Sequence, residues 1–167
     1  MVPMNKNKQF EEIYKANVQS ITRLCYLYLK DLSLAEDATQ ETFINAYRKL
    51  SAFKNKSSIN TWLTSIAINA CKSIMRQKDY KSHISLDEAR EVKVHTNIDK
   101  DTKISLTEAV KNLPIDLRTV ILLKYYRDLS ISEIAKIVKA PETTVNYRLL
   151  KAKELLKDML KEDIIYD

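Results

Sequence analysis

The chain has 167 residues, among which 28 lysines and arginines outnumber 22 aspartates and glutamates and give a formal net charge of +6. A chain of this length forms one ordinary domain or two small ones. Glycine is absent and cysteine occurs only at Cys25 and Cys71, so a glycine-rich phosphate loop, a disulfide framework and a zinc knuckle are excluded. The positive charge favours a polyanionic partner.

Hydropathy separates the chain from membrane and secreted proteins. No apolar run approaches the roughly 20 residues that a membrane-spanning helix needs. The N-terminal tail, residues 1–9, is polar and lacks the apolar stretch of a secretion signal. We therefore expect a cytoplasmic protein of the all-α class, with both cysteines in helical cores and no stable membrane insertion.

Three helices are predicted in a first unit, residues 10–80. Apolar residues recur at helical spacing from Phe10 to Tyr28, which predicts a long first helix. Ser33 and Glu36 fit the S-x-x-E capping pattern and predict the start of a second helix. After a polar loop at 51–58, a third apolar stripe begins at Trp62, and we expect its helix to end near residues 76–78.

Residues 81–104 lack periodicity and carry balanced charges, so we interpret them as a flexible linker between two small helical domains. A short helix that opens at Ser85 and is capped with Glu88 is possible there. Both histidines, His83 and His95, lie in this stretch, and their spacing gives only weak support for a metal site.

A second helical unit is predicted at residues 105–163. It opens with another capping pattern, Ser105 with Glu108, and with an apolar face that includes Leu106. Pro114 ends this helix, and a further helix runs to Tyr125.

Residues 129–149 have the spacing of a helix-turn-helix. Ser130 is placed to cap a short helix through Glu133, a turn follows at 138–140, and Pro141 suits the start of the next helix. Lys139 occupies a turn position that often holds glycine, which a lysine tolerates at a cost of about 1 kcal/mol. The alternative is an ordinary helical hairpin. In the helix-turn-helix interpretation the side chains that point toward a major groove are Thr143, Thr144, Asn146, Tyr147, Arg148 and Lys151.

Charge is distributed unevenly along the chain. Residues 42–78 contain no acidic residue and seven basic ones, whereas Asp31, Glu36, Asp37 and Glu41 lie in a stretch without a basic residue. A second basic cluster falls in the last third of the chain. A single charged run is usually a solvated helix face, but two basic clusters on separate helical units favour nucleic acid as the partner.

Three motifs in this order carry a family resemblance: residues 34–47, residues 61–69, and Leu113-Pro114 followed by the helix-turn-helix. The chain resembles the extracytoplasmic-function (ECF) sigma factors of bacteria over roughly 10–80 and 105–160. Lys139 and Thr143 stand where the family usually has glycine. The resemblance implies a dissociable subunit that binds core RNA polymerase and promoter DNA, opens the duplex, and is commonly held inactive by an anti-sigma factor.

The resemblance also implies roles for particular residues. The clamp of the largest polymerase subunit would bind Asp37, Gln40, Glu41 and Phe43, and the flap of the second subunit would be a further contact of the chain. The minus-ten element would be read and opened by a loop pocket and the third helix, through Phe53, Lys54, Lys56, Ser58, Asn69, Lys72 and Arg76. The minus-thirty-five element would be read by the second helix of the helix-turn-helix, with Arg148 as the leading base reader.

Two other classes of function stay open on the residues alone. A conventional helix-turn-helix regulator would use the N-terminal unit for dimerisation or ligand sensing, but a ligand sensor should not show the bare basic stretch at 42–78. A helical-bundle enzyme should carry inward carboxylates and histidines at i, i+3 spacing, and the sequence has none. We therefore expect neither enzymatic activity nor a cofactor.

Overall fold

The computed structural model describes residues 5–85 and 105–160, with the side chains of 80–85 excepted. Within these ranges every regular element is helical and none is a strand, which confirms the all-α prediction. The elements in chain order are α1 (Lys6–Leu29), α2 (Leu32–Lys49), the 3₁₀ turn η1 (Leu50–Ala52), α3 (Ile59–Ser85), α4 (Leu106–Lys111), α5 (Ile115–Ile121), the π-helical segment η2 (Leu122–Tyr126), α6 (Ile131–Val138) and α7 (Glu142–Leu160).

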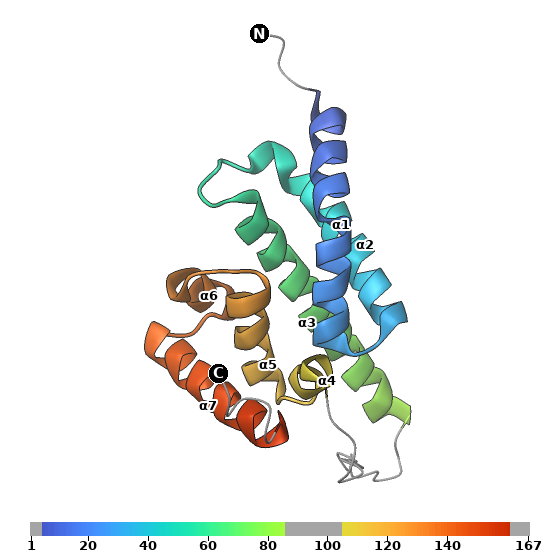
Figure 1. Ribbon diagram of the computed structural model, residues 1–167. Helices are drawn as coiled ribbons and strands as arrows, with labels where there is room; N and C mark the ends of the chain where they lie inside the picture. The colour runs from blue at the N-terminus through green and yellow to red at the C-terminus, as the bar shows by residue number, and fades with distance from the viewer. Residues whose placement is uncertain (1–4, 86–104, 161–167) are drawn as a thin grey trace.

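Helices α1, α2 and α3 form the N-terminal unit, in which α1 packs against both of the others (Figure 1). Its centre is apolar and includes the two free cysteines, Cys25 on α1 and Cys71 on α3, which are buried as predicted. Helix α3 continues to Ser85, so it is longer than expected and takes up the first residues assigned to the linker. The rest of that linker, and the helix expected to form with Glu88, lie outside the described residues.

The start of α2 differs from the prediction. The side chain of Asp31 caps the helix by accepting a hydrogen bond from the backbone N–H of Leu34 at 2.9 Å. Ser33, expected as the cap, is instead an exposed residue of the first helical turn. A carboxylate one position before the helix satisfies a free N–H at least as well as a serine does. Asp31 therefore takes the cap position, and the S-x-x-E pattern at Ser33 and Glu36 does not mark the start of the helix.

The C-terminal unit packs α4, α5 and α6 against α7. Ser105 caps α4 by accepting from the N–H of Glu108 at 3.2 Å, as predicted. Pro114 stands immediately before α5, and its carbonyl accepts the first bonds of that helix. Leu106 was expected to face inward, but it is 61% exposed because it lies in the first turn of a short helix.

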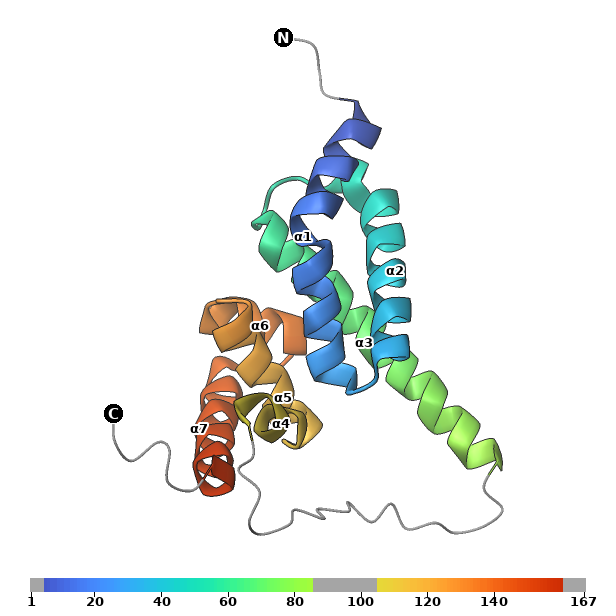
Figure 2. The ribbon, with the colours of Figure 1, turned by 45° about the vertical axis from the view of Figure 1, so that its right-hand side comes forward.

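The two units pack against each other, a relationship that helical periodicity does not reveal (Figure 2). Helix α1 contacts α4, α5 and η2, and α3 contacts α6. The guanidinium of Arg118 donates to the carbonyl of Tyr28, and the hydroxyl of Tyr126 donates to the carbonyl of Ser20 at 3.2 Å. One continuous apolar core therefore runs through both units.

Candidate nucleic-acid interface

Helices α6 and α7 form the predicted helix-turn-helix. Ser130 and Glu133 make a complete capping box: the Ser130 hydroxyl accepts from the Glu133 N–H at 3.2 Å, and the Glu133 carboxylate accepts from the Ser130 N–H at 2.9 Å. Lys139 ends α6 in the left-handed conformation, with φ 56° and ψ 48°. The turn therefore keeps the geometry that glycine usually provides, as the sequence predicted.

Helix α7 has one buried and one exposed face. Val145 and Leu149 pack into the core. The outer face exposes Tyr147, which is 60% exposed, and Leu150, which the sequence analysis missed. Three further residues expected at DNA are also exposed on α7, namely Thr143, Asn146 and Lys151, whereas Thr144 is half-buried.

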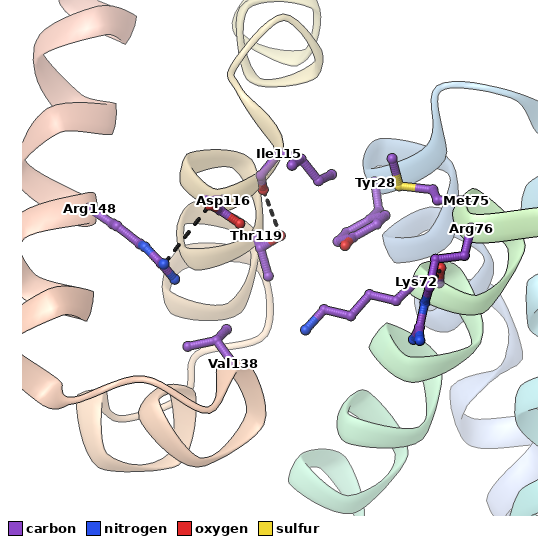
Figure 3. A pocket seen from close by; sticks show the side chains of 9 residues that line it. All are labelled: Tyr28, Lys72, Met75, Arg76, Ile115, Asp116, Thr119, Val138 and Arg148. Atoms are coloured by element: carbon purple, nitrogen blue, oxygen red, sulfur yellow. Dashed lines mark hydrogen bonds and ion pairs between the residues drawn. The ribbon is translucent and has the colours of Figure 1, made fainter. Parts of the chain in front are cut away.

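Arg148 does not share this outer face. At about 100° per residue, it lies roughly 100° around the helix from Tyr147. Its side chain turns toward α5, where Nη2 is 3.9 Å from the carboxylate of Asp116, and it is only 26% exposed (Figure 3). Arg148 therefore points away from the exposed face on which Asn146 and Tyr147 lie.

A pocket of about 450 Å³ is formed by the loop between η1 and α3, at the place expected to capture a base. Lys54 and Lys56 line it and are exposed. The ring of Phe53 stacks on Trp62, with centroids 4.6 Å apart and an interplanar angle of 30°. Ser58 does not line the pocket, because its hydroxyl accepts from the N–H of Thr61 at 3.1 Å and caps α3.

On α3 the three residues expected at DNA lie along one side, at spacings of three and four. Asn69 is exposed. Lys72 and Arg76 line a cavity of about 340 Å³ between the two units, which Arg148 also lines (Figure 3). Burial lowers the pKa of Lys72, and the charges of Lys139, Arg76 and Arg148 lower it further, against the opposing effect of Asp116.

Helix α2 presents the acidic stretch to solvent. Asp37, Gln40 and Glu41 are all exposed. Phe43, predicted alongside them, is only 4% exposed and belongs mainly to the core. It does line a groove of about 400 Å³ formed with aromatic residues that the sequence analysis did not assign to a site, namely Phe10, Tyr14 and Tyr47.

These features define a class: a helical protein of two units with a helix-turn-helix in one and an exposed basic loop and helix in the other. Comparison with known proteins narrows it. Residues 13–80 match the sigma-70 region 2 family and residues 103–156 match sigma-70 region 4. The ECF RNA polymerase sigma factor SigW of Bacillus subtilis is 32% identical over 165 residues, covering 90% of this chain and 87% of SigW.

A second relative, the ECF RNA polymerase sigma-E factor of Haemophilus influenzae, is 31% identical over 75% of this chain and 74% of its own length. The chain belongs to the ECF RNA polymerase sigma factors. Among solved structures, the sigma factor RpoE of Bartonella quintana, in complex with the anti-sigma factor NepR, shares the fold with a TM-score of 0.74 at 23% identity. The structural match covers 93% of this chain and 99% of the RpoE chain.

CnrH, solved with the cytosolic domain of CnrY, has the same fold, with a TM-score of 0.66 at 17% identity over 94% of this chain and 90% of CnrH. In the described parts of this chain, no helix combines the length and apolar character needed to cross a membrane. Nor do three histidine, cysteine, aspartate or glutamate side chains gather there as ligands for a metal ion.

Proposed function

We propose that this chain is a dissociable initiation subunit that binds core RNA polymerase, recognises two promoter elements and opens the duplex, and that it has no catalytic chemistry of its own. The observation that carries the proposal is the pairing of a complete helix-turn-helix at 130–160 with an exposed basic pocket at 53–57. Because transcription takes place in the bacterial cytoplasm, we propose that compartment as its site of action.

The polymerase clamp would bind α2. Asp37, Gln40 and Glu41 are exposed within about one helical turn, which suits a basic partner helix. The aromatic groove that Phe43 helps to line adjoins this surface at Gln40. An apolar side chain of the partner could be buried there.

The polymerase flap would bind an apolar groove of about 360 Å³ on the C-terminal unit. Leu106 and Tyr125, which are 61% and 58% exposed, lie on its rim. Exposed apolar side chains around a groove are typical of a surface that a partner helix covers, and Leu106 would contribute to such a surface.

The minus-ten element would be bound by α3 and the loop before it. An extruded base needs a pocket, and its backbone needs positive charge, both of which the loop provides with Lys54 and Lys56. Phe53 would act as one wall of that pocket, since its ring is already stacked on Trp62. Asn69 would read a base edge, while Lys72 and Arg76 would hold phosphates.

The minus-thirty-five element would lie against the outer face of α7. Asn146 and Tyr147 would face base edges, with Thr143 and Thr144 beside them, and Lys151 would hold a phosphate. Arg148 would join the base readers only after it leaves Asp116, since its guanidinium is turned away from the outer face. Bidentate contact of an arginine to guanine then adds about 1–3 kcal/mol of discrimination.

An anti-sigma factor completes the proposed set of partners. Two proteins of this fold were each solved with a partner bound: RpoE of Bartonella quintana with the anti-sigma factor NepR, and CnrH with the cytosolic domain of CnrY. The exposed apolar grooves on the two units are the surfaces that we propose an inhibitor would occupy in competition with the polymerase.

Reconstitution with core RNA polymerase tests the proposal. The purified chain should co-migrate with core enzyme and confer start-specific transcription on it. Reversing two charges, Asp37→Lys with Glu41→Lys, should weaken core binding at least tenfold while the helical content stays unchanged. Asp158→Lys, an exposed charge reversal on α7, is the control. Affinity for core enzyme that is unchanged by the double reversal would remove α2 as the clamp contact.

A further inference from the structure

The cavity between the two units collects positive side chains from both. Lys72 and Arg76 come from α3, and Arg148 comes from α7 (Figure 3). Tyr28 of α1 and Thr119 of α5 also line it with hydroxyl-bearing side chains, and Asp116 is the one carboxylate among the lining residues. The cavity therefore has several hydrogen-bond donors and an excess of positive charge.

Asp116 balances little of this charge. Its side chain is 72% exposed and stands 3.9 Å from the nearest guanidinium nitrogen of Arg148, at the outer limit of an ion pair. Lys139 lies close enough to add to the repulsion felt by Lys72, whose pKa is lowered by its burial and by its basic neighbours. Packing the two units together thus brings like charges toward one another, which opposes the packed arrangement.

Two buried arginines also oppose the packed arrangement of the units. Arg118 and Arg127, both 6% exposed, lie between the units without a carboxylate partner in the described residues. Nε of Arg118 and Nη2 of Arg127 also lack a hydrogen-bond acceptor in these parts of the chain. Separating the units would return both guanidinium groups to water, which favours separation. The apolar contact between the units favours packing and must outweigh this effect.

We propose that this cavity is a binding site for a small multivalent anion of the phosphate class, which bridges the two units and stabilises their packed arrangement. Its volume of about 340 Å³ is that of a small-ligand site. Charge-assisted hydrogen bonds from one lysine and two arginines suit a pyrophosphate-like group better than a single carboxylate. The cavity is far too small for duplex DNA, whose major groove alone is about 12 Å wide.

The site would have a consequence for promoter binding, and this step rests on the proposed function. Lys72, Arg76 and Arg148 are among the side chains proposed to contact DNA, so these three groups cannot hold the anion and the promoter at the same time. A bound anion would shift the free chain toward the packed arrangement in proportion to its occupancy.

Titration of the full chain, free of polymerase, tests the proposal. Sodium pyrophosphate added in a calorimeter should bind at a single saturable site, and X-ray scattering should show a smaller radius of gyration when the site is filled. Lys72→Ala and Arg148→Ala should each weaken binding by about tenfold, because each removes one charged donor. Asp116→Asn should tighten binding severalfold, because it removes the one opposing charge. Lys8→Ala removes an exposed charge of α1 away from the cavity and should change nothing.

Three outcomes would overturn the site. Sodium chloride at the same ionic strength could compact the chain equally, which would mean charge screening only. Lys8→Ala could weaken binding as much as Lys72→Ala, which would mean diffuse association of an adventitious ion only. Pyrophosphate could bind while Asp116→Asn leaves its affinity unchanged, which would place the ion elsewhere. None of these outcomes bears on transcription with core enzyme, so the proposed function would stand or fall separately.

Discussion

Nε of Arg127 in the C-terminal unit donates a hydrogen bond of 2.9 Å to Oγ1 of Thr64 in the N-terminal unit. Both side chains are buried. The link is doubled by Asn60, one turn before Thr64, whose side-chain amide donates to the backbone carbonyl of Arg127 at 3.0 Å. Asn60 and Thr64, both bonded to Arg127, therefore fix the end of η2 against the first turns of α3, the helix proposed to read DNA.

Replacing Thr64 with valine removes the acceptor of Arg127 and keeps the volume of the side chain. Because Arg127 is buried with another nitrogen already unpaired, the change should lower the free energy of unfolding by about 1–3 kcal/mol. Urea unfolding of both proteins measures this difference. Thr22→Val is the matched control, since Thr22 bonds only to its own helix through the Val18 carbonyl. Equal effects of the two substitutions would show that the Arg127 contact contributes nothing.

Acid should weaken the contact between α6 and α3. Hydrogen bonds from Ser130 and Thr61 hold the pKa of Glu133 below its ordinary value of 4.5. A carboxyl with a lowered pKa in the folded chain contributes stability that is full above pH 4.5 and is lost as the pH falls through the folded value. Glu133→Gln should therefore be less stable than the natural protein at neutral pH, and the two should converge below pH 4.5 in unfolding curves. A constant gap at all pH values would contradict this assignment.

Lys139 holds a left-handed backbone conformation at a cost, with φ 56°. Glycine adopts this conformation without a steric penalty, but its greater freedom in the unfolded chain offsets part of the gain, so Lys139→Gly should raise the stability by less than about 1 kcal/mol. Lys139→Ala keeps the Cβ atom and should leave stability nearly unchanged. Denaturant unfolding compares the three proteins. A gain for alanine as large as that for glycine would mean that charge, and not backbone strain, sets the cost.

On the outer face of α7, we expect different residues to make the base contacts and the phosphate contacts. Asn146→Ala should change which base is preferred at one minus-thirty-five position, because its amide can pair with a base edge. Lys151→Ala should weaken all sequences alike and lower the slope of affinity against salt by about one unit. Binding of holoenzyme to a panel of promoter variants at several salt concentrations measures both effects. A uniform loss from Asn146→Ala would mean that this residue reads no base.

At the minus-ten element, we expect Asn69 to contact a base and Lys72 to contact a phosphate. On a template with a pre-melted bubble, Asn69→Ala should alter the preferred base, and Lys72→Ala should lower affinity without altering preference. Transcription from bubbles that differ at one base measures the preference. If Asn69→Ala lost activity only on duplex templates and kept the natural preference on the bubble, Asn69 would serve opening and not reading.

Local features of this fold could be predicted from the sequence, because their causes lie within a few residues. The capping box of Ser130 with Glu133 and the left-handed turn at Lys139 are examples. The start of α2 could not be fixed, since Asp31 and Ser33 both offer a capping oxygen and only the backbone geometry selects one.

Contacts between the units were beyond prediction. Arg118 and Arg127 resemble surface arginines in the sequence, and their partners Tyr28 and Thr64 are distant along the chain. Within the C-terminal unit, the packing of α7 against α5 turns Arg148 toward Asp116 and away from the outer face of α7. The residue types of the surfaces proposed to face DNA could therefore be predicted from the sequence, whereas the orientation of their side chains in the free chain depends on tertiary contacts.

Permanganate probing of strand opening tests the central claim most directly. Core RNA polymerase, this chain and a duplex promoter are combined, and unpaired thymines are mapped around the minus-ten element. A promoter-opening subunit predicts reactive thymines there only when the chain and core enzyme are both present, and their loss with a variant that lacks Lys54 and Lys56. Sequence-specific protection of the duplex by the chain alone, with no thymine made reactive in the presence of core enzyme, would contradict the account and indicate a conventional helix-turn-helix regulator.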